Sequence, residues 1–297
     1  ISGMTGKIIK GIGGFYYIHA PKTDEVYSCR AVGIFRKLGI KPLVGDNVEF
    51  EILDEDKREG SLTKILEREN VLIRPAVANI DQAMVVFAVR EPELNTNLLD
   101  RFLIYMGMQD IPVNIFLNKS DLNRDGLMER YRYIYENAGY RVICGSTENE
   151  ADVDSIREVL KDKTTVLAGP SGVGKSSLTN KLNDGVCMEV GELSAKIKRG
   201  KQTTRHTELF TIDADSYVLD TPGFTSLYVT GVETDRLGFY FEEFNDYYDK
   251  CKYTGCSHIY EAEDICAVKR AVAEGKIPEE RYDNYRLIYE ELKDKER

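Results

Sequence analysis

The sequence predicts a multidomain α/β protein with an all-β region first, a mostly parallel α/β sheet next and a helical region last. Glycine-punctuated apolar alternation fills residues 4–72. Strand-like apolar runs then alternate with helical patterns to residue 228, and an acidic, aromatic region follows. A chain of 297 residues is long enough for two or three domains. We therefore expect domains at residues 1–72, 73–228 and 229–297.

Composition and charge exclude several classes of protein. The 42% hydrophobic and 30% charged residues are ordinary for globular proteins and exclude pervasive disorder. The sequence has no apolar run long enough to span a membrane and no secretory signal, so we expect a cytoplasmic protein without membrane contact. Residues 1–3 precede Met4 and are expected to be a cloning remnant. A net charge of −10 argues against a simple DNA-binding protein.

The N-terminal region has the pattern of short strands separated by turns. Strand regions are expected at residues 6–19, 26–35 and 44–53, and apolar residues alternate with acidic ones from Val48 to Ile52. A unit of this size predicts a five-stranded β-barrel of the oligonucleotide-binding (OB) type, which would bind RNA. A generic small barrel of SH3-like kind is the alternative.

The central region alternates strands with helices. The apolar runs at residues 83–89 and 113–117 are typical of strands buried on both faces. Further strands are expected at residues 141–144, 165–168, 208–212 and 217–219, and helices at residues 98–108, 127–137, 154–160 and 175–182. Strands joined by helical crossovers form a parallel sheet.

The last expected helix, at residues 279–292, carries a stripe of apolar and aromatic side chains on one face. The stripe consists of Tyr282, Tyr285, Tyr289 and Leu292. We interpret it as core packing rather than as a ligand site.

A phosphate-binding loop lies between a predicted strand and a predicted helix. Residues 169–176 read GPSGVGKS and match the motif G-x-x-x-x-G-K-[ST] in full. Backbone N–H groups of such a loop and the N-terminus of the following helix bind phosphate oxygens, and Lys175 reaches the β- and γ-phosphates. Ser176 is the expected Mg²⁺ ligand. The nucleotide-contacting residues expected here are Gly169, Pro170, Ser171, Gly172, Val173, Gly174, Lys175, Ser176 and Ser177.

A second motif, DTPG at residues 220–223, ends the strand predicted at residues 217–219. An acid at the carboxyl end of a strand beside the phosphate loop suits a second Mg²⁺ contact, which we assign to Asp220. Gly223 is expected to sense the γ-phosphate.

A guanine-reading motif, NKSD, follows the buried strand predicted at residues 113–117. Its residues are Asn118, Lys119, Ser120 and Asp121. The aspartate accepts hydrogen bonds from guanine N1–H and the exocyclic amine, whereas adenine would leave the carboxylate unpaired. The strand end at Gly145, Ser146 and Thr147 is expected to present N–H groups to guanine O6. By itself NKSD also occurs by chance in loops, but with a phosphate loop in the same sheet it predicts GTP and GDP as ligands.

The order of the motifs is unusual, because NKSD precedes the phosphate loop instead of following it. All parts of a GTPase are present in a rotated order, which predicts a circular permutation with new ends near residues 80 and 225.

The switch region between the phosphate loop and DTPG leaves several roles open. Thr204 is favoured over Thr203 as the Mg²⁺-coordinating switch residue. The position where many GTPases carry a water-orienting glutamine is Phe224, so unaided hydrolysis is expected to be slow. His206 is a candidate catalytic group, with a bystander role as the alternative.

Three cysteines and a histidine cluster near the C-terminus as Cys251-x4-Cys256-x-His258-x7-Cys266. A Cys₃His set is a closed tetrahedral zinc site of the structural kind. Disulfide or redox roles are disfavoured in the cytoplasm, and a catalytic zinc would need an open position.

The sequences GPSGVGKSS, NKSD and DTPGF, the terminal Cys/His cluster and residues 36–50 (RKLGIKPLVGDNVEF) together resemble the ribosome small subunit-dependent GTPase A family. The resemblance covers nearly the whole chain. It implies an OB barrel, a permuted GTPase centre, a zinc-bearing C-terminal domain and a role in late maturation of the small (30S) ribosomal subunit, with its 16S rRNA and proteins as partners.

We therefore expect a monomeric, subunit-stimulated GTPase. Its RNA contacts are expected in the barrel at Arg36, Lys37 and Lys41 and in the basic run at residues 196–205. The alternatives are an RNA-binding scaffold that holds GTP with little turnover, and an ATPase or small-molecule kinase, which NKSD disfavours.

Overall fold

The computed structural model describes residues 3–184, 207–221 and 227–296, with Arg36 and Asp184 described in their backbone only. The chain divides into two compact units. The first contains the N-terminal barrel with the described parts of residues 153–167 and 176–222, and the second contains residues 83–152, 168–175 and the described part of 223–297. None of the helices in the described ranges has the length and apolarity needed to span a membrane.

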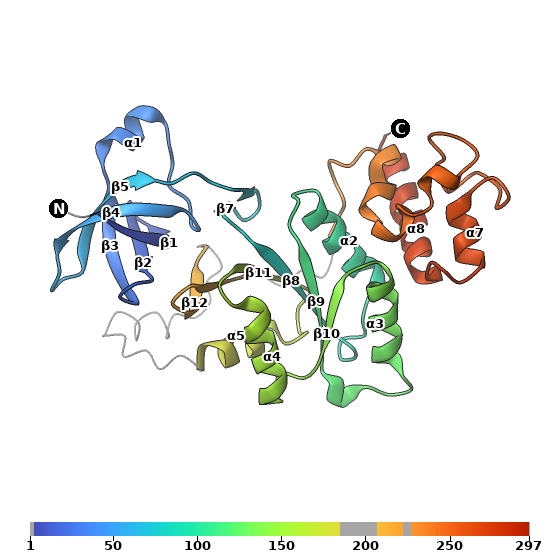
Figure 1. The fold of residues 1–297 in the computed structure, drawn as a ribbon, viewed down its shortest axis with the longest axis horizontal. Coiled ribbons are helices and arrows are strands. Elements are labelled where there is room, and N and C mark those ends of the chain that lie inside the picture. The colour runs from blue at the N-terminus through green and yellow to red at the C-terminus, as the bar shows by residue number, and fades with distance from the viewer. Residues whose placement is uncertain (1–2, 185–206, 222–226, 297) are drawn as a thin grey trace. The chain divides into compact units, whose positions relative to one another are not determined.

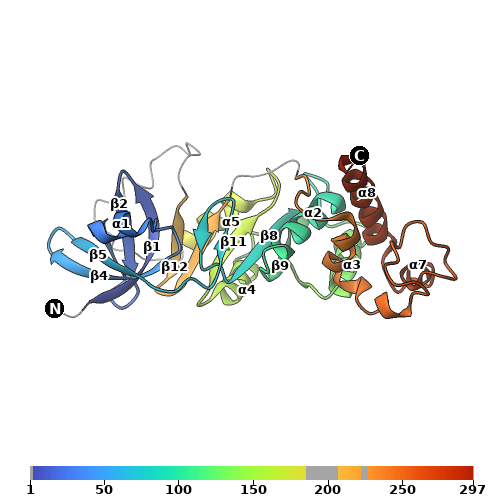
Figure 2. The same cartoon turned by 90° about the horizontal axis from the view of Figure 1, so that it is seen from above.

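Five N-terminal strands close into a barrel in the order β1-β2-β3-β5-β4 (Figures 1 and 2). They are β1 (Met4–Ile12), β2 (Phe15–Ala20), β3 (Glu25–Ala31), β4 (Asn47–Asp54) and β5 (Glu59–Ile65). Neighbours are antiparallel except β3 and β5, which are parallel. Ile8, Ile18, Val48, Phe50 and Leu62 are fully buried inside it. The predicted OB-type barrel is confirmed.

One prediction for the barrel is wrong. The sequence suggests a strand over residues 26–35, but β3 ends at Ala31 and a short helix, α1 (Gly33–Leu38), follows. Phe35 is buried while Leu38 is exposed. Six residues are too few for the spacing of apolar side chains to separate a helix from a strand. The sequence analysis also assigns no strand to the ranges of β5 or of the small antiparallel pair β6 (Val71–Leu72) and β7 (Val77–Ala78).

The central sheet has six strands in the order β10-β9-β8-β11-β13-β12. They are β8 (Gln82–Ala88), β9 (Val113–Asn118), β10 (Arg141–Cys144), β11 (Thr164–Ala168), β12 (Leu209–Asp213) and β13 (Ser216–Asp220). The pairs β8–β9, β9–β10 and β11–β13 are parallel, and β12 is antiparallel to β13. The predicted mostly parallel sheet is confirmed.

The helices of this region are α2 (Thr96–Gly107), α3 (Leu127–Asn137), α4 (Glu150–Leu160) and α5 (Lys175–Asp184), with a 3₁₀ turn η1 (Ser120–Leu122) after β9. Helix α4 begins four residues before the predicted start at residue 154. Its first turn carries Glu150 and Asp152, which favour a helix N-terminus electrostatically but leave no apolar signal in the sequence.

The C-terminal region is built from the 3₁₀ segments η2 (Thr234–Tyr240), η3 (Glu242–Phe244) and η4 (Tyr248–Lys250) and the helices α7 (Ala267–Ala273) and α8 (Glu279–Lys295). Tyr285, Tyr289 and Leu292 of α8 are buried in one core with Phe241 and Phe244, and Tyr282 packs against its edge. The interpretation of the α8 stripe as core packing is confirmed.

A buried charge cluster joins α8 to α2 within the second unit. The Arg281 guanidinium donates from Nη1 to Asp100 Oδ1 (2.6 Å) and from Nε to Glu243 Oε1 (2.5 Å). All three side chains are at most 3% exposed. Arg281 is also stacked 4.5 Å from the centre of the Phe241 ring. This cluster fixes α8 against the helix that follows β8.

In the first unit, the barrel is hydrogen-bonded to the β12–β13 pair. The fully buried His19 of β2 pairs through Nδ1 with the Tyr217 hydroxyl (2.7 Å) and through Nε2 with Asp24 Oδ1 (2.8 Å). Lys10 forms an ion pair with Glu208 at 3.1 Å, next to the start of β12. The strand that ends at Asp220 is therefore held directly by the barrel.

Candidate nucleotide and metal sites

The phosphate loop follows β11, whose five residues are all buried, and leads into α5. Gly169 has φ +144°, and a Cβ there would lie 2.2 Å from the Val86 carbonyl oxygen. Gly174 has φ +101°, and a Cβ there would lie 2.2 Å from Asn118 Nδ2. Only glycine fits either position, because the backbone conformation and the space both exclude a side chain.

Lys175, the lysine of this loop, is 8% exposed. Its ammonium group donates to the carbonyl oxygens of Gly169 (2.8 Å) and Pro170 (2.9 Å). The group thus lies within the loop, at the start of α5, where an anion would also meet the helix N-terminus. Ser176 and Ser177, which follow it, are exposed.

Asn118 connects the guanine-reading motif to the phosphate loop. It ends β9, is 1% exposed, and donates from Nδ2 to the Val173 carbonyl (2.8 Å). Its Oδ1 accepts hydrogen bonds from the N–H groups of Lys119 (2.8 Å) and Thr147 (3.0 Å). One buried amide therefore holds three loops of the predicted site together.

The other residues of the motif lie beside Asn118. Lys119 donates from Nζ to the Gly172 carbonyl (3.0 Å) and to the Glu91 carbonyl, so its alkyl chain runs along the phosphate loop. The exposed Asp121 accepts at Oδ1 from the Ser146 hydroxyl (3.2 Å). The structure thus brings NKSD, the strand end at Ser146 and the phosphate loop into one site within the second unit, as the sequence predicts.

The N–H groups of the strand end have acceptors within the protein. The N–H groups of Gly145, Ser146 and Thr147 donate to the Leu117 carbonyl (3.1 Å), Asp152 Oδ2 (2.9 Å) and Asn118 Oδ1 (3.0 Å). Each N–H group therefore has an acceptor inside the protein. A hydrogen bond to guanine O6 from this loop would have to share one of them. Sequence reasoning also missed Asp152, because an acid in the first turn of a helix is ordinary.

The first residue of DTPG is paired with the last part of strand β11, within the first unit. Asp220 is the β13 partner of Leu167 in the parallel β11–β13 pair, and Leu167 is two residues before Gly169. The next residue, Thr221, donates from its hydroxyl to the Leu167 carbonyl (2.7 Å). A carboxylate oxygen and the Ser176 hydroxyl are ligands that suit Mg²⁺. Thr203, Thr204, His206, Gly223, Phe224 and the basic run at residues 196–205 lie outside the described residues.

Cys251, Cys256, His258 and Cys266 come together, with their ligand atoms all within 4.8 Å of one another. His258 Nδ1 lies 3.4 Å from Cys266 Sγ and 3.7 Å from Cys251 Sγ. The N–S edge of a tetrahedral zinc site is about 3.6 Å, worked from Zn–S and Zn–N bond lengths. Burial raises the pKa of the Cys256 and Cys266 thiols, and a bound cation would reverse this by favouring thiolates. The cluster fits zinc.

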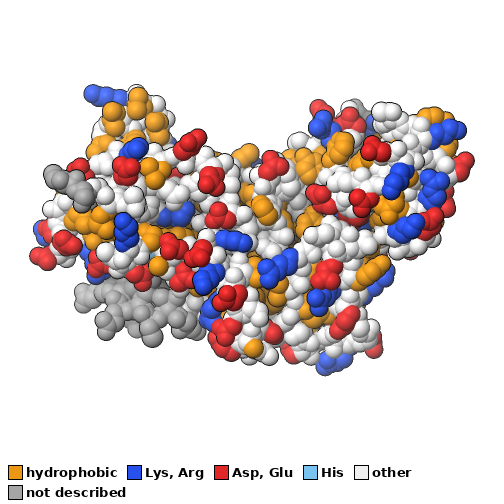
Figure 3. All heavy atoms as spheres, in the orientation of Figure 1, with side chains coloured by type: hydrophobic (Ala, Val, Ile, Leu, Met, Phe, Trp, Pro, Cys, Tyr) orange, Lys and Arg blue, Asp and Glu red, His pale blue; other side chains and the backbone are white. Residues whose placement is uncertain are grey.

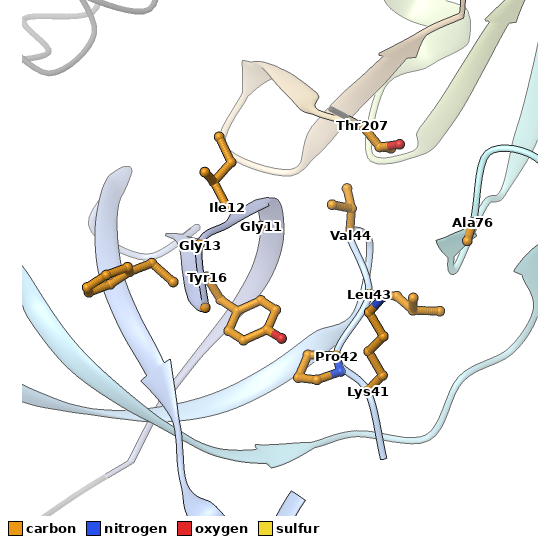
Figure 4. Close-up of a pocket in the computed structure, with 12 residues that line it drawn as sticks. Gly11, Ile12, Gly13, Tyr16, Lys41, Pro42, Leu43, Val44, Ala76 and Thr207 are labelled. Atoms are coloured by element: carbon orange, nitrogen blue, oxygen red, sulfur yellow. The ribbon is translucent and has the colours of Figure 1, made fainter. Parts of the chain in front are cut away.

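The barrel carries a cavity of about 330 Å³ (Figure 4). It lies among the tip of the β1–β2 hairpin, residues 41–44, Ala76 and Thr207. Tyr16 and Lys41 line it, so an aromatic ring and a cation share one wall region (Figure 4). Such a pair suits a base and a phosphate of single-stranded nucleic acid. Elsewhere on the face drawn in Figure 3, acidic and basic side chains are interspersed.

A phosphate loop and a guanine-reading motif that meet on a mostly parallel sheet, with their order along the chain rotated, define a circularly permuted GTPase. Comparisons with known proteins agree. Residues 65–230 match the family model described as RsgA GTPase, and residues 5–61 match the RsgA N-terminal domain. The chain therefore belongs to the RsgA GTPase family.

Two relatives and two solved structures extend along nearly the whole chain. A protein from Agathobacter rectalis, named small ribosomal subunit biogenesis GTPase RsgA, is 51% identical over 99% of this chain and 100% of its own length. A protein of the same name from Alkaliphilus metalliredigens is 45% identical over 97% of each. The crystal structure of YloQ, titled a circularly permuted GTPase, is 40% identical, has a TM-score of 0.79, and matches 99% of this chain and 96% of its own. The crystal structure of YjeQ from Thermotoga maritima is 32% identical, has a TM-score of 0.81, and matches 98% of this chain and 99% of its own.

Proposed function

We propose that this GTPase binds the small ribosomal subunit, acts late in the maturation of that subunit, and is stimulated by it. The observation that carries the proposal is the full-length similarity to relatives whose names state small ribosomal subunit biogenesis. A monomer in the cytoplasm, where its partner assembles, belongs to the same proposal.

The site residues take the following roles in the proposal. Asp121 pairs with guanine N1–H and the exocyclic amine, Asn118 and Ser146 hold the base site, and the Lys119 chain packs along the base. The loop from Gly169 to Ser177 binds the phosphates through N–H groups, and Lys175 supplies positive charge where charge develops during transfer. Ser176, Asp220 and Thr204 are the proposed Mg²⁺ ligands. When bound, Mg²⁺ neutralises charge on the β- and γ-phosphate oxygens.

Partner stimulation is proposed because Phe224 occupies the position expected of a water-orienting glutamine. A phenyl ring cannot align water, so the missing group would come from the subunit or from His206. The same observation favours the alternative, an RNA-binding scaffold that holds GTP with little turnover.

The barrel is the proposed RNA contact. In support, Tyr16 and Lys41 line one cavity, and its wall is continuous with the β1–β2 hairpin. The hydrogen bond from the barrel to Tyr217 offers a physical link between bound RNA and the strand that ends at Asp220. Zinc at Cys251, Cys256, His258 and Cys266 is proposed to be structural, with one ion per chain.

Co-sedimentation with purified ribosomal subunits tests the proposal. The protein should pellet with small subunits in the presence of a non-hydrolysable GTP analogue, less with GDP, and not with large subunits. Equal binding to both subunits in both nucleotide states would contradict it.

A further inference from the structure

The loop that follows β10 is held by a side chain outside the sequence motifs. Asp152, in the first turn of α4, accepts at Oδ2 from the N–H group of Ser146 at 2.9 Å. Its carboxylate also packs on Gly145, where a Cβ would lie 2.8 Å from Asp152 Cγ. Asp152 therefore contacts two consecutive residues of the loop from one side.

The same loop sets the position of the guanine-reading carboxylate. Ser146 is 6% exposed, and its hydroxyl donates to Asp121 Oδ1 at 3.2 Å. The same hydroxyl oxygen accepts a hydrogen bond from the Glu148 N–H group at 3.2 Å. Asp152 accepts a hydrogen bond from the Ser146 backbone, and the Ser146 side chain donates one to Asp121. The position of the Asp121 carboxylate therefore depends on Asp152.

The geometry requires accurate placement of Asp121. A carboxylate that accepts two hydrogen bonds from guanine, at N1–H and at the exocyclic amine, needs both of its oxygens in the plane of the base. The Ser146 hydroxyl engages Oδ1 and so limits rotation of the exposed carboxylate. Without that contact, the carboxylate can rotate so that only one of its two hydrogen bonds to guanine remains.

We infer that Asp152 is a positioning residue for guanine recognition, acting through Ser146 on Asp121. The inference rests on the proposed role of Asp121 as the guanine reader. The inference assigns Asp152 no contact with the nucleotide, and its negative charge is favoured by the N-terminus of α4. Gly145 is part of the same arrangement, because a side chain at this position would displace the Asp152 carboxylate.

The test compares affinities for GDP and IDP, because hypoxanthine lacks the exocyclic amine. The wild-type protein should prefer GDP. Asp152→Ala should reduce the ratio Kd(IDP)/Kd(GDP) by about tenfold, or about 1.4 kcal/mol, as expected when most of one hydrogen bond to a charged group is lost. Asp152→Asn keeps an acceptor oxygen for Ser146 and should stay within about twofold of the wild-type ratio. Displacement of a fluorescent GDP analogue gives both constants.

Two further variants keep the test decisive. Gly145→Ala leaves Asp152 in the sequence but displaces its carboxylate, so it should lower the ratio as Asp152→Ala does. Asp154→Ala, on the same helix but paired with Arg157 at the surface, is the matched control and should leave the ratio unchanged.

A purely structural role for Asp152 would weaken GDP and IDP binding equally and leave their ratio unchanged, which would overturn the inference. Asp121→Asn separates this failure from failure of the proposed function. If that variant turns to xanthosine diphosphate while Asp152→Ala keeps its ratio, only the inference falls. If Asp121→Asn keeps its guanine preference, the base-reading assignment falls and the inference with it.

Discussion

The buried charge cluster of Arg281, Asp100 and Glu243 predicts a large, pH-dependent effect of Arg281→Met. Methionine removes the guanidinium that lies between two buried carboxylates, at 2.6 Å from Asp100 Oδ1 and 2.5 Å from Glu243 Oε1. Breaking a buried ion pair by removing one partner costs about 3–5 kcal/mol, because the remaining charge is uncompensated. We expect this cost in the free energy that holds α8 against α2.

The pH dependence follows from Asp100. Burial raises the pKa of this carboxyl above its ordinary value of 3.8, although Arg281 and Asn284 oppose the shift. Because the pKa of Asp100 is higher in the folded than in the unfolded state, its carboxylate does not destabilise the fold at pH values below the unfolded-state pKa. The destabilisation grows as the pH rises towards the folded-state pKa and is complete above it. Loss of Arg281 raises the pKa further. The deficit of Arg281→Met should therefore be smaller near pH 4.5 than at pH 7.5.

Amide hydrogen exchange in α8 is the suitable assay, because the chain has more than one unit and a single unfolding temperature does not isolate this contact. A loss of about 3–5 kcal/mol predicts exchange faster by roughly 150- to 5,000-fold. Arg130→Met is the matched control, since the Arg130–Glu280 pair is 52% and 35% exposed and such pairs contribute about 0–1 kcal/mol. An Arg281→Met effect as small as the control's, or one independent of pH, would refute the reasoning.

Three other predictions follow from the sites. Gly174→Ala should weaken GDP binding at least about 100-fold, because the new Cβ would overlap Asn118 Nδ2 and displace the amide that holds three loops together. Calorimetric titration measures the affinity for GDP, and an affinity equal to that of the wild type would contradict the prediction. Removal of zinc by a chelator should release about one equivalent per chain and expose the buried Tyr285; since the chain has 18 Tyr and no Trp, tyrosine fluorescence reports this, and an unchanged spectrum would exclude a structural metal. Binding to small subunits should weaken steeply between about 50 and 200 mM salt if basic side chains contact RNA phosphates; insensitivity to salt would remove that contact from the account.

Local patterns predicted most of the regular structure. Residues 127–137 and 141–144 coincide with α3 and β10 because their helical and strand spacings are complete and glycines lie close to their ends. The predicted strand over residues 26–35 failed, since the short helix α1 leaves too little periodicity to detect. The domain boundaries at residues 72 and 228 stay predictions.

Contiguous motifs gave the main parts of the nucleotide and metal sites, because each carries its chemistry within a few residues. The structural roles of Asp152 and Arg281 could not be predicted from the sequence. Arg281 pairs with Asp100, 181 residues away, and no local pattern encodes such a contact. Asp152 acts on Ser146 across a loop, and its importance is visible only from the hydrogen bonds that the loop makes. The roles of Thr203, Thr204 and His206 stay predictions.

GTP turnover of the purified protein, measured alone and with isolated small ribosomal subunits, tests the central claim most directly. The account predicts a slow basal rate that rises many-fold with small subunits and does not rise with large subunits. A basal rate that small subunits leave unchanged would contradict it.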